Sequence, residues 1–271
     1  MGSDFSAHPV SAPVSGLVPN ALYHVRLVAT NSAGTTYGPD QTFTTPQDQP
    51  PPPPVLGQAV DVKPVSGLVL VKLPGQSARD ASGAHLRVHA GLAKGVGFIP
   101  LTEARQLPTG TQVDARLGKI QLTAAASTRH GKLQNGTFNG GLFKLSQDRG
   151  GFTKGLTTLS LLEGAFPGSP TYASCKAKKA TDATAPFASA ALSSTVLQSL
   201  RSSAHGKFRT RGHYSAATVR GTAWTMSDRC DGTLVTVQRD TVAVQDFVRH
   251  VTVVVRAGHS YLARASRKGK R

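Results

Sequence analysis

Five consecutive prolines, residues 50–54, divide this 271-residue chain. Proline has no amide hydrogen to donate and fixes φ at about −65°, so the run cannot sit inside a sheet or a helix and follows a stiff polyproline II path. Such a segment separates folded units. We therefore expect a linker at 46–57 between a short unit, 1–45, and a larger unit, 58–263, followed by a basic, disordered tail at 264–271.

The basic character of the chain lies beyond that linker. The formal net charge is +17, and residues 1–54 contribute −2 of it, so the rest of the chain carries +19. A surface of this sign favours anionic partners. The 28 glycines and 17 prolines favour many short strands joined by turns. Because no window approaches about 18 uncharged apolar residues, we expect no membrane span.

The N-terminal unit is predicted to be a β-hairpin, with strands at 22–29 and 41–45 and a turn signal at 30–34. Leu17, Pro19 and Tyr23 have the Leu-x-Pro-x-x-x-Tyr spacing of a tyrosine corner, in which the phenol bonds to backbone at a strand crossover. With the Ala-x-Asn-x-x-Gly loop, residues 8–45 resemble the last strands of a fibronectin type III domain. A complete sandwich needs roughly 90–100 residues, so the resemblance implies a fragment of a longer chain; the alternative is a hairpin extension that packs on the second unit.

The larger unit is predicted to be all-β, because short apolar alternations recur at roughly ten-residue spacing, as in a sandwich or barrel. One short helix is expected at 192–200, where apolar residues stand at 192, 196, 197 and 200. Asp231 and Gly232 form a tight turn signal, and loops are expected at 75–96, 126–136 and 167–186. The expected strands are 67–73, 97–101, 111–115, 119–123, 137–145, 157–162, 207–212, 217–226, 233–237, 242–244 and 251–255.

A second resemblance lies at 217–224, Ala-Thr-Val-Arg-Gly-Thr-x-Trp, which contains Gly221, Thr222 and Trp224. Together with the turn at 231–232, two valine strands and Arg-Ala-Gly at 256–258, it is similar to the second half of a FecR-type domain, an extracytoplasmic β domain. Two departures are Asp-Thr at 240–241, where glycine commonly sits, and a long insertion at 146–206. The resemblance covers about 60–263 and implies a secreted bacterial multidomain protein, located outside the cell or at its surface, whose signal peptide lies upstream of this sequence.

Cys175 and Cys230 are the only cysteines, 55 residues apart. An even count in a loop-rich β domain of exported type favours a disulfide, which would stabilise the fold by about 3–4 kcal/mol on the chain-entropy estimate; free thiols are the alternative. Two cysteines without a nearby histidine or cysteine pair make a poor zinc site. His85 and His89 are flanked by glycines without a nearby acid, so no metal and no cofactor is expected.

The sequence favours a protein without catalytic activity. It contains no Gly-x-Ser-x-Gly, phosphate loop, His-Glu-x-x-His or CxxC pattern. Glycoside hydrolysis needs two carboxylates that flank the bond, but Asp228 and Asp231 are expected to serve the hairpin turn and ion pairs with Arg220 and Arg229. The two glutamates, at 103 and 163, are expected at strand ends.

The remaining candidate site is cationic. Lys207, Arg209 and Arg211 alternate and so share one face of a strand, with Arg220 on the next strand. They would form a cationic stripe for an anionic polysaccharide or cell-wall polymer, or for other domains of a longer chain. Alternatively, they are solvated and partly paired with Asp228 and Asp231. Nucleic acid is disfavoured, because no recognition helix, ribonucleoprotein aromatic pair or zinc finger is present.

These observations favour a non-catalytic exported or cell-surface module for adhesion, scaffolding or sensing. One alternative is the accessory binding domain of a larger extracellular hydrolase, and a further one is a nonspecific nucleic-acid binder.

Overall fold

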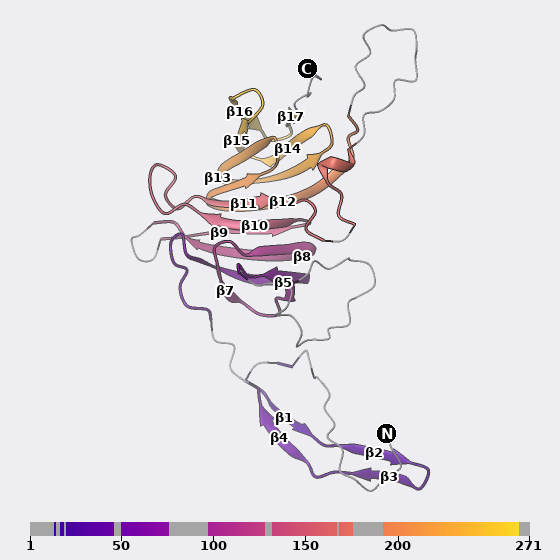
Figure 1. Cartoon of the computed structure of the whole chain (residues 1–271). Coiled ribbons are helices and arrows are strands. Elements are labelled where there is room, and N and C mark those ends of the chain that lie inside the picture. The colour runs from indigo at the N-terminus through magenta and orange to yellow at the C-terminus, as the bar shows by residue number, and fades with distance from the viewer. Residues whose placement is uncertain are drawn as a thin grey trace, which may run out of the picture. The chain divides into compact units, whose positions relative to one another are not determined.

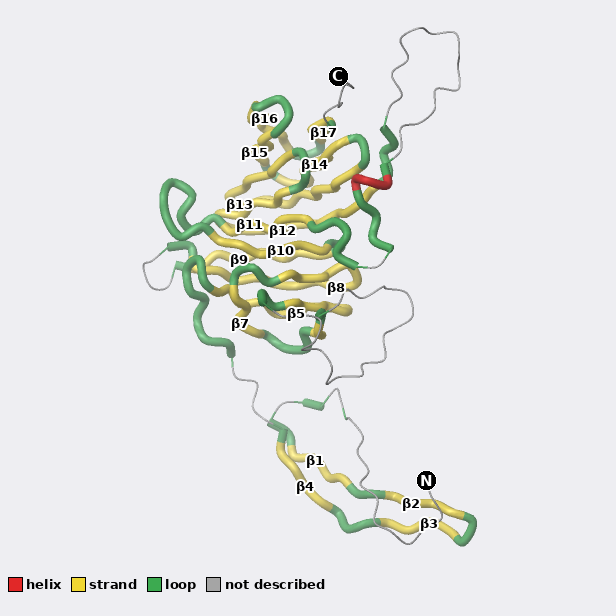
Figure 2. Tube along the Cα trace, in the orientation of Figure 1, coloured by secondary structure: helices red, strands yellow, loops and turns green. Residues whose placement is uncertain are grey.

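The computed structural model describes residues 14, 17–18, 20–45, 50–75, 97–127, 132–166, 168–175 and 192–265. The chain divides into two compact units, residues 1–50 and 51–271. The predicted all-β class is confirmed: strands make up nearly all regular structure in the described part, and its one helical element is the single 3-10 turn η1 (Tyr172–Ser174) (Figure 1, Figure 2). No described helix has the length and apolarity to cross a membrane.

The first unit is a long, two-part hairpin. Strand β1 (Leu22–Val25) pairs with β4 (Gln41–Thr44), and β2 (Val28–Asn31) pairs with β3 (Gly34–Tyr37), which confirms the predicted hairpin. The Tyr23 hydroxyl accepts the Val18 amide at 2.7 Å, so the expected tyrosine-corner contact also forms. Leu17 is half-buried, and Pro19 lies outside the described residues. The fibronectin resemblance itself stays a prediction.

The second unit is built from thirteen strands within its described part. All neighbouring pairs are antiparallel except β11 with β12, which is parallel. The strands are β5 (Ala59–Lys72), β6 (Ile99–Pro100), β7 (Arg105–Pro108), β8 (Gln112–Ala125), β9 (Leu133–Asn139), β10 (Leu142–Gln147), β11 (Thr157–Leu161), β12 (Val196–Arg211), β13 (Ser215–Arg229), β14 (Gly232–Arg239), β15 (Thr241–Asp246), β16 (Val251–Arg256) and β17 (Ser260–Arg264).

Four long strands, β5, β8, β12 and β13, change partners halfway along their length, and this divides the unit into two layers. In layer A the order is β7, the first half of β5, the second half of β8, β9, the first half of β12, the second half of β13, β14 and β17. In layer B the order is β6, the remaining halves of β5 and β8, β10, β11, the remaining halves of β12 and β13, β15 and β16.

The hydrophobic core lies between the two layers. Phe138 of layer A packs against Phe143 and Phe208 of layer B, with ring centroids 6.4 and 5.6 Å apart. Trp224, also in layer A, is fully buried and donates its indole N–H to Thr210 Oγ1 in layer B at 2.8 Å. These contacts join the layers face to face, as in a β-sandwich.

Glycines stand where the long strands bend. Gly67 and Gly118 are directly opposite each other in β5 and β8. A β-carbon on Gly67 would lie 2.1 Å from the Leu117 carbonyl oxygen, and one on Gly118 would lie 2.5 Å from that of Leu68. Gly206 has the corresponding place in β12, next to a register shift between 205 and 208. Only glycine permits such close backbone approach, so Gly67 and Gly118 set the position of the bend in β5 and β8.

The helix expected at 192–200 is wrong, because this segment leads into strand β12. Leu200 and Ala204 face the core in alternation, and β12 bonds to β13 on one side and β9 on the other. Apolar residues three and four positions apart are typical of a helix. In this segment, hydrogen bonding to two partner strands determines the structure instead. Parts of the segments expected as loops at 126–136 and 167–186 also adopt regular structure, in β9 and η1.

Strand boundaries also differ from those expected. Segments 111–115 and 119–123 are one strand, β8, whereas 137–145 is divided between β9 and β10 by a turn at 140–141. The hairpin turn expected at 231–232 forms one residue earlier: Cys230 and Asp231 are its loop, and Gly232 pairs with Arg229. Residues 76–96, most of a segment expected as a loop, lie outside the described part.

Candidate anion-binding face

The outer surface of layer B carries the cations singled out in the sequence. Phe208 and Thr210 of β12 are fully buried, so Arg209, between them, and Arg211, after them, point away from the core. Lys207 precedes Phe208 within the register shift between residues 205 and 208. Lys207 and Arg211 are exposed and Arg209 is half-buried. Arg220 belongs to β13, but its side chain lies outside the described part of the structure.

The strand register adds two lysines that sequence reasoning missed. Lys72, Gln112, Lys144, Ser160 and Arg211 form one continuous cross-strand row from β5 to β12. The next row contains Ser146, Thr158, Arg209 and Thr218. Neither row contains an aspartate or a glutamate. We call the outer surface formed by Lys72, Lys144, Lys207, Arg209 and Arg211 the cationic face.

The cations of this face form no ion pair with any described carboxylate. Arg209 Nε donates to Thr218 Oγ1 at 3.3 Å, and Lys207 Nζ donates to the Lys154 carbonyl at 3.2 Å. The Arg211 guanidinium lies 4.7 Å from the centre of the Phe247 ring. These contacts hold the side chains in place and leave their charges without an acidic partner in the described residues.

The alternative pairing of Lys207, Arg209 and Arg211 with Asp228 and Asp231 is therefore wrong, whereas the pairing of Arg220 stays a prediction. Asp231 binds Arg229 through two hydrogen bonds of 2.8 and 2.6 Å. The two oxygens of Asp228 both accept the His213 amide at 3.0 Å, and one also accepts the Thr233 hydroxyl. Both carboxylates bind neighbouring groups of the β12–β14 region. Of the ion pairs predicted from the sequence, Arg229–Asp231 is confirmed.

A polar cavity of about 240 Å³ lies at the Arg211 end of the cationic face. It forms because the β12–β13 hairpin bends back on itself, so that its tip, at 212–214, meets its base. Asp228 at the base binds the tip through the His213 amide. A β-carbon on Gly212 would lie 2.3 Å from Asp228 Oδ1, so this closure requires glycine. Ser160, Glu163, Tyr172, Arg211, His213 and Asp228 line the cavity.

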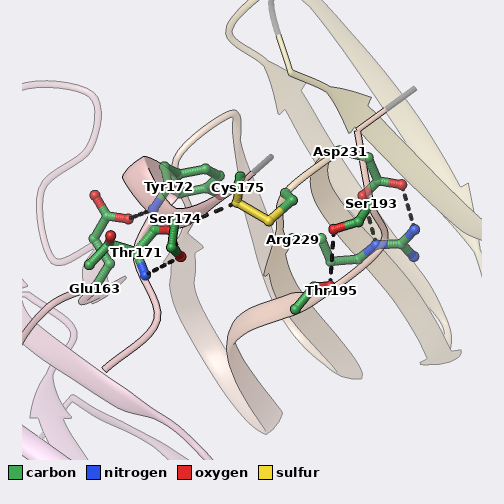
Figure 3. The surroundings of a disulfide bond; sticks show 10 residues. Glu163, Thr171, Tyr172, Ser174, Cys175, Ser193, Thr195, Arg229 and Asp231 are labelled. Atoms are coloured by element: carbon green, nitrogen blue, oxygen red, sulfur yellow. Dashed lines mark hydrogen bonds and ion pairs between the residues drawn. A yellow bond between two sulfur atoms is a disulfide. The ribbon is translucent and has the colours of Figure 1, made fainter. Parts of the chain in front are cut away.

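The disulfide holds the wall of that cavity. Cys175 and Cys230 are joined, with Cα atoms 5.4 Å apart, so free thiols are excluded and the predicted bond is confirmed (Figure 3). It ties the turn η1 to the end of β13. Glu163 accepts the Tyr172 amide at 2.8 Å (Figure 3), and the Tyr172 ring lies 4.2 Å from the His213 ring, centre to centre.

Burial sets the protonation of the groups around the cavity. It raises the pKa of Asp228, and hydrogen bonds from the Thr233 hydroxyl and the His213 amide oppose that shift. Burial and the Asp228 charge raise the pKa of Tyr172, and burial, Asp228 and Glu163 raise the pKa of Tyr214. Both phenols are therefore neutral at physiological pH. The cluster offers hydroxyls, a ring surface, one guanidinium and the carboxylates of Glu163 and Asp228 to a ligand.

No three metal-binding side chains come close enough to hold a metal ion within the residues that the structure describes. His85 and His89 lie outside these residues. Comparison of the chain with protein-family models, with curated proteins and with solved structures gives no match.

Proposed function

We propose that the second unit is a non-catalytic binding module for an anionic polysaccharide of a cell wall or cell surface, which it holds along the cationic face. The observation that carries the proposal is the cross-strand row from Lys72 to Arg211, in which cations alternate with uncharged polar residues and no carboxylate intervenes. Because neighbouring strands lie about 4.8 Å apart, the row spans about 19 Å.

The chemistry of the face favours a sugar polymer over a nucleic acid. Its hydroxyls and amides, from Gln112, Ser146 and Ser160, match sugar hydroxyls, while the lysines and arginines match phosphate or carboxylate groups. Proteins that hold single-stranded nucleic acid stack bases on aromatic rings, and the two rows contain none. The disulfide supports a location in an oxidising compartment outside the cytosol.

The test compares two triple variants with the same loss of charge. One replaces Lys207, Arg209 and Arg211 by glutamine. The control replaces Arg105, Lys132 and Arg249, which are exposed cations outside the cationic face. The probe is polygalacturonate, an anionic polysaccharide, with neutral dextran as the uncharged reference, and the readout is the dissociation constant by calorimetry in about 0.3 M salt, where only close contacts escape screening.

We expect the first triple variant to bind about tenfold to thirtyfold more weakly at the cationic face, since exposed charge contacts are worth up to about 1 kcal/mol each. The control variant should bind within about twofold of the unmodified protein. Equal losses in both variants would show that binding follows net charge alone, and the proposal would fail.

A further inference from the structure

The outer surface of layer A, on the other side of the sandwich, repeats the features of the cationic face. Lys119, Asn139, Arg201, Thr225 and Thr236 are directly opposite one another in successive strands, from β8 to β14. They alternate with core residues and so point outward. A parallel row contains Lys63, Gln121, Thr137, Ser203 and Ala223.

The cations of these rows have no acidic partner among the described residues. Lys63, Lys119 and Arg201 form no ion pair there, and neither row contains a carboxylate or an aromatic ring. Lys63 and Arg201 are exposed and Lys119 is half-buried. We call the surface defined by Lys63, Lys119 and Arg201 the second face.

A hollow of about 210 Å³ lies in this surface. Its lining includes Gln121, Asn135, Thr137, Ser203, His205 and Arg239. Arg239 pairs with the exposed Asp240 at 3.5 Å, a contact that solvent weakens and that an incoming anion can replace. The hollow therefore combines amide and hydroxyl groups with a guanidinium, the same chemistry as the cationic face.

The two faces point in opposite directions because the layers pack through their inner sides. Strand β12 contributes to both: Arg201 precedes the bend at Gly206 and lies in layer A, whereas Arg209 and Arg211 follow it and lie in layer B. Packed sheets lie about 10 Å apart before their outer side chains are added. A polymer segment lying flat on one face therefore does not reach the other.

We infer that the second face binds the same class of anionic polysaccharide, so that one module links two polymer segments. This inference rests on the proposed function and extends it from holding a polymer to cross-linking one. A protein with two opposed sites and a polymer with many sites form a network whose size is greatest at intermediate ratios and falls when protein is in excess.

The experiment uses the full chain and three variants with polygalacturonate. The second-face variant replaces Lys63, Lys119 and Arg201 by glutamine; the other two are the Lys207–Arg209–Arg211 variant and the Arg105–Lys132–Arg249 control. Light scattering across a range of protein-to-polymer ratios measures cross-linking, calorimetry measures affinity, and circular dichroism with thermal melting checks that each variant is folded. Sedimentation without polymer reports whether the protein is monomeric.

The inference predicts a scattering maximum for the unmodified protein and for the control, and at least a fivefold smaller maximum for each single-face variant, with binding retained in the second-face variant. If that variant scatters like the unmodified protein, the second face carries no site and the inference fails while the proposed function stands. If calorimetry shows that the Lys207–Arg209–Arg211 variant binds as many polymer segments per protein molecule as the unmodified protein, the proposed function fails. Equal cross-linking of an oligothymidine of matched length would overturn the assignment to polysaccharide. A stable dimer in the absence of polymer would overturn the claim that one molecule carries both sites.

Discussion

Replacing Asp228 by alanine should lower the free energy of unfolding of the second unit more than almost any other substitution of a single polar residue. The carboxylate accepts the His213 amide through both oxygens and the Thr233 hydroxyl through one. Two donors bonded to a charged group contribute about 1.5–3 kcal/mol each. Removal of the buried carboxylate returns part of its desolvation cost, so we expect a net loss of about 2–4 kcal/mol in the free energy of unfolding.

The variant Asp228→Asn separates shape from charge. The asparagine side chain retains one acceptor oxygen and nearly the same volume, so we expect a smaller loss, about 1 kcal/mol at neutral pH. Burial raises the pKa of Asp228 in the folded protein, so between the unfolded and folded pKa values the folded state binds more protons. The stability of the unmodified protein relative to Asp228→Asn is therefore greatest at acid pH and falls as pH rises through the folded pKa.

The assay is urea unfolding followed by tryptophan fluorescence. Trp224 is the single tryptophan and is fully buried in this unit, so its emission reports the unfolding of the two layers alone. Urea unfolding at several pH values gives the difference in free energy of unfolding between the unmodified protein and each variant, on the condition that their m-values are equal. An Asp228→Ala protein as stable as the unmodified one, or a relative stability that increases with pH, would refute the proposed role of Asp228.

Two further changes test the fold. Replacing Cys175 and Cys230 by serine removes a cross-link over 55 residues and should lower the free energy of unfolding by about 4 kcal/mol; a melting temperature within about 2 °C of the unmodified protein, measured by calorimetry, would contradict this. Gly118→Ala places a β-carbon 2.5 Å from the Leu68 carbonyl and should cost about 2 kcal/mol or more in urea unfolding, whereas Gly150→Ala, with nothing within 4 Å, should cost less than about 1 kcal/mol. Similar losses for both would contradict the close approach of β5 and β8.

Local patterns in the sequence predicted the features that depend on near neighbours. Alternation predicted the strands around Trp224, and the Leu-x-Pro-x-x-x-Tyr spacing predicted the bond from Tyr23 to the backbone of residue 18. Cysteine count and context predicted the disulfide. The helix predicted before Leu200 was wrong because the apolar spacing there fits a helix as well as a strand. Only pairing with β9 and β13 distinguishes the two structures.

The cationic face could be predicted only in part, because its rows depend on register. Lys207, Arg209 and Arg211 share a strand, so their alternation was visible. Lys144 and Lys72 join them through β11, β10 and β8, and no local signal links strands so far apart in sequence. Asp228 likewise binds a residue 15 positions earlier, a contact that exists only after the β12–β13 hairpin has bent.

The most direct test of the account is to locate a bound polymer on the protein. Titration of a short oligogalacturonate into ¹⁵N-labelled protein, followed by NMR, should shift amides of β10, β11 and the second half of β12, centred on Lys144, Ser160 and Arg211, together with those around Arg201 on the opposite layer. Shifts confined to the hairpin unit or to the C-terminal basic residues, with these strands unchanged, would contradict it.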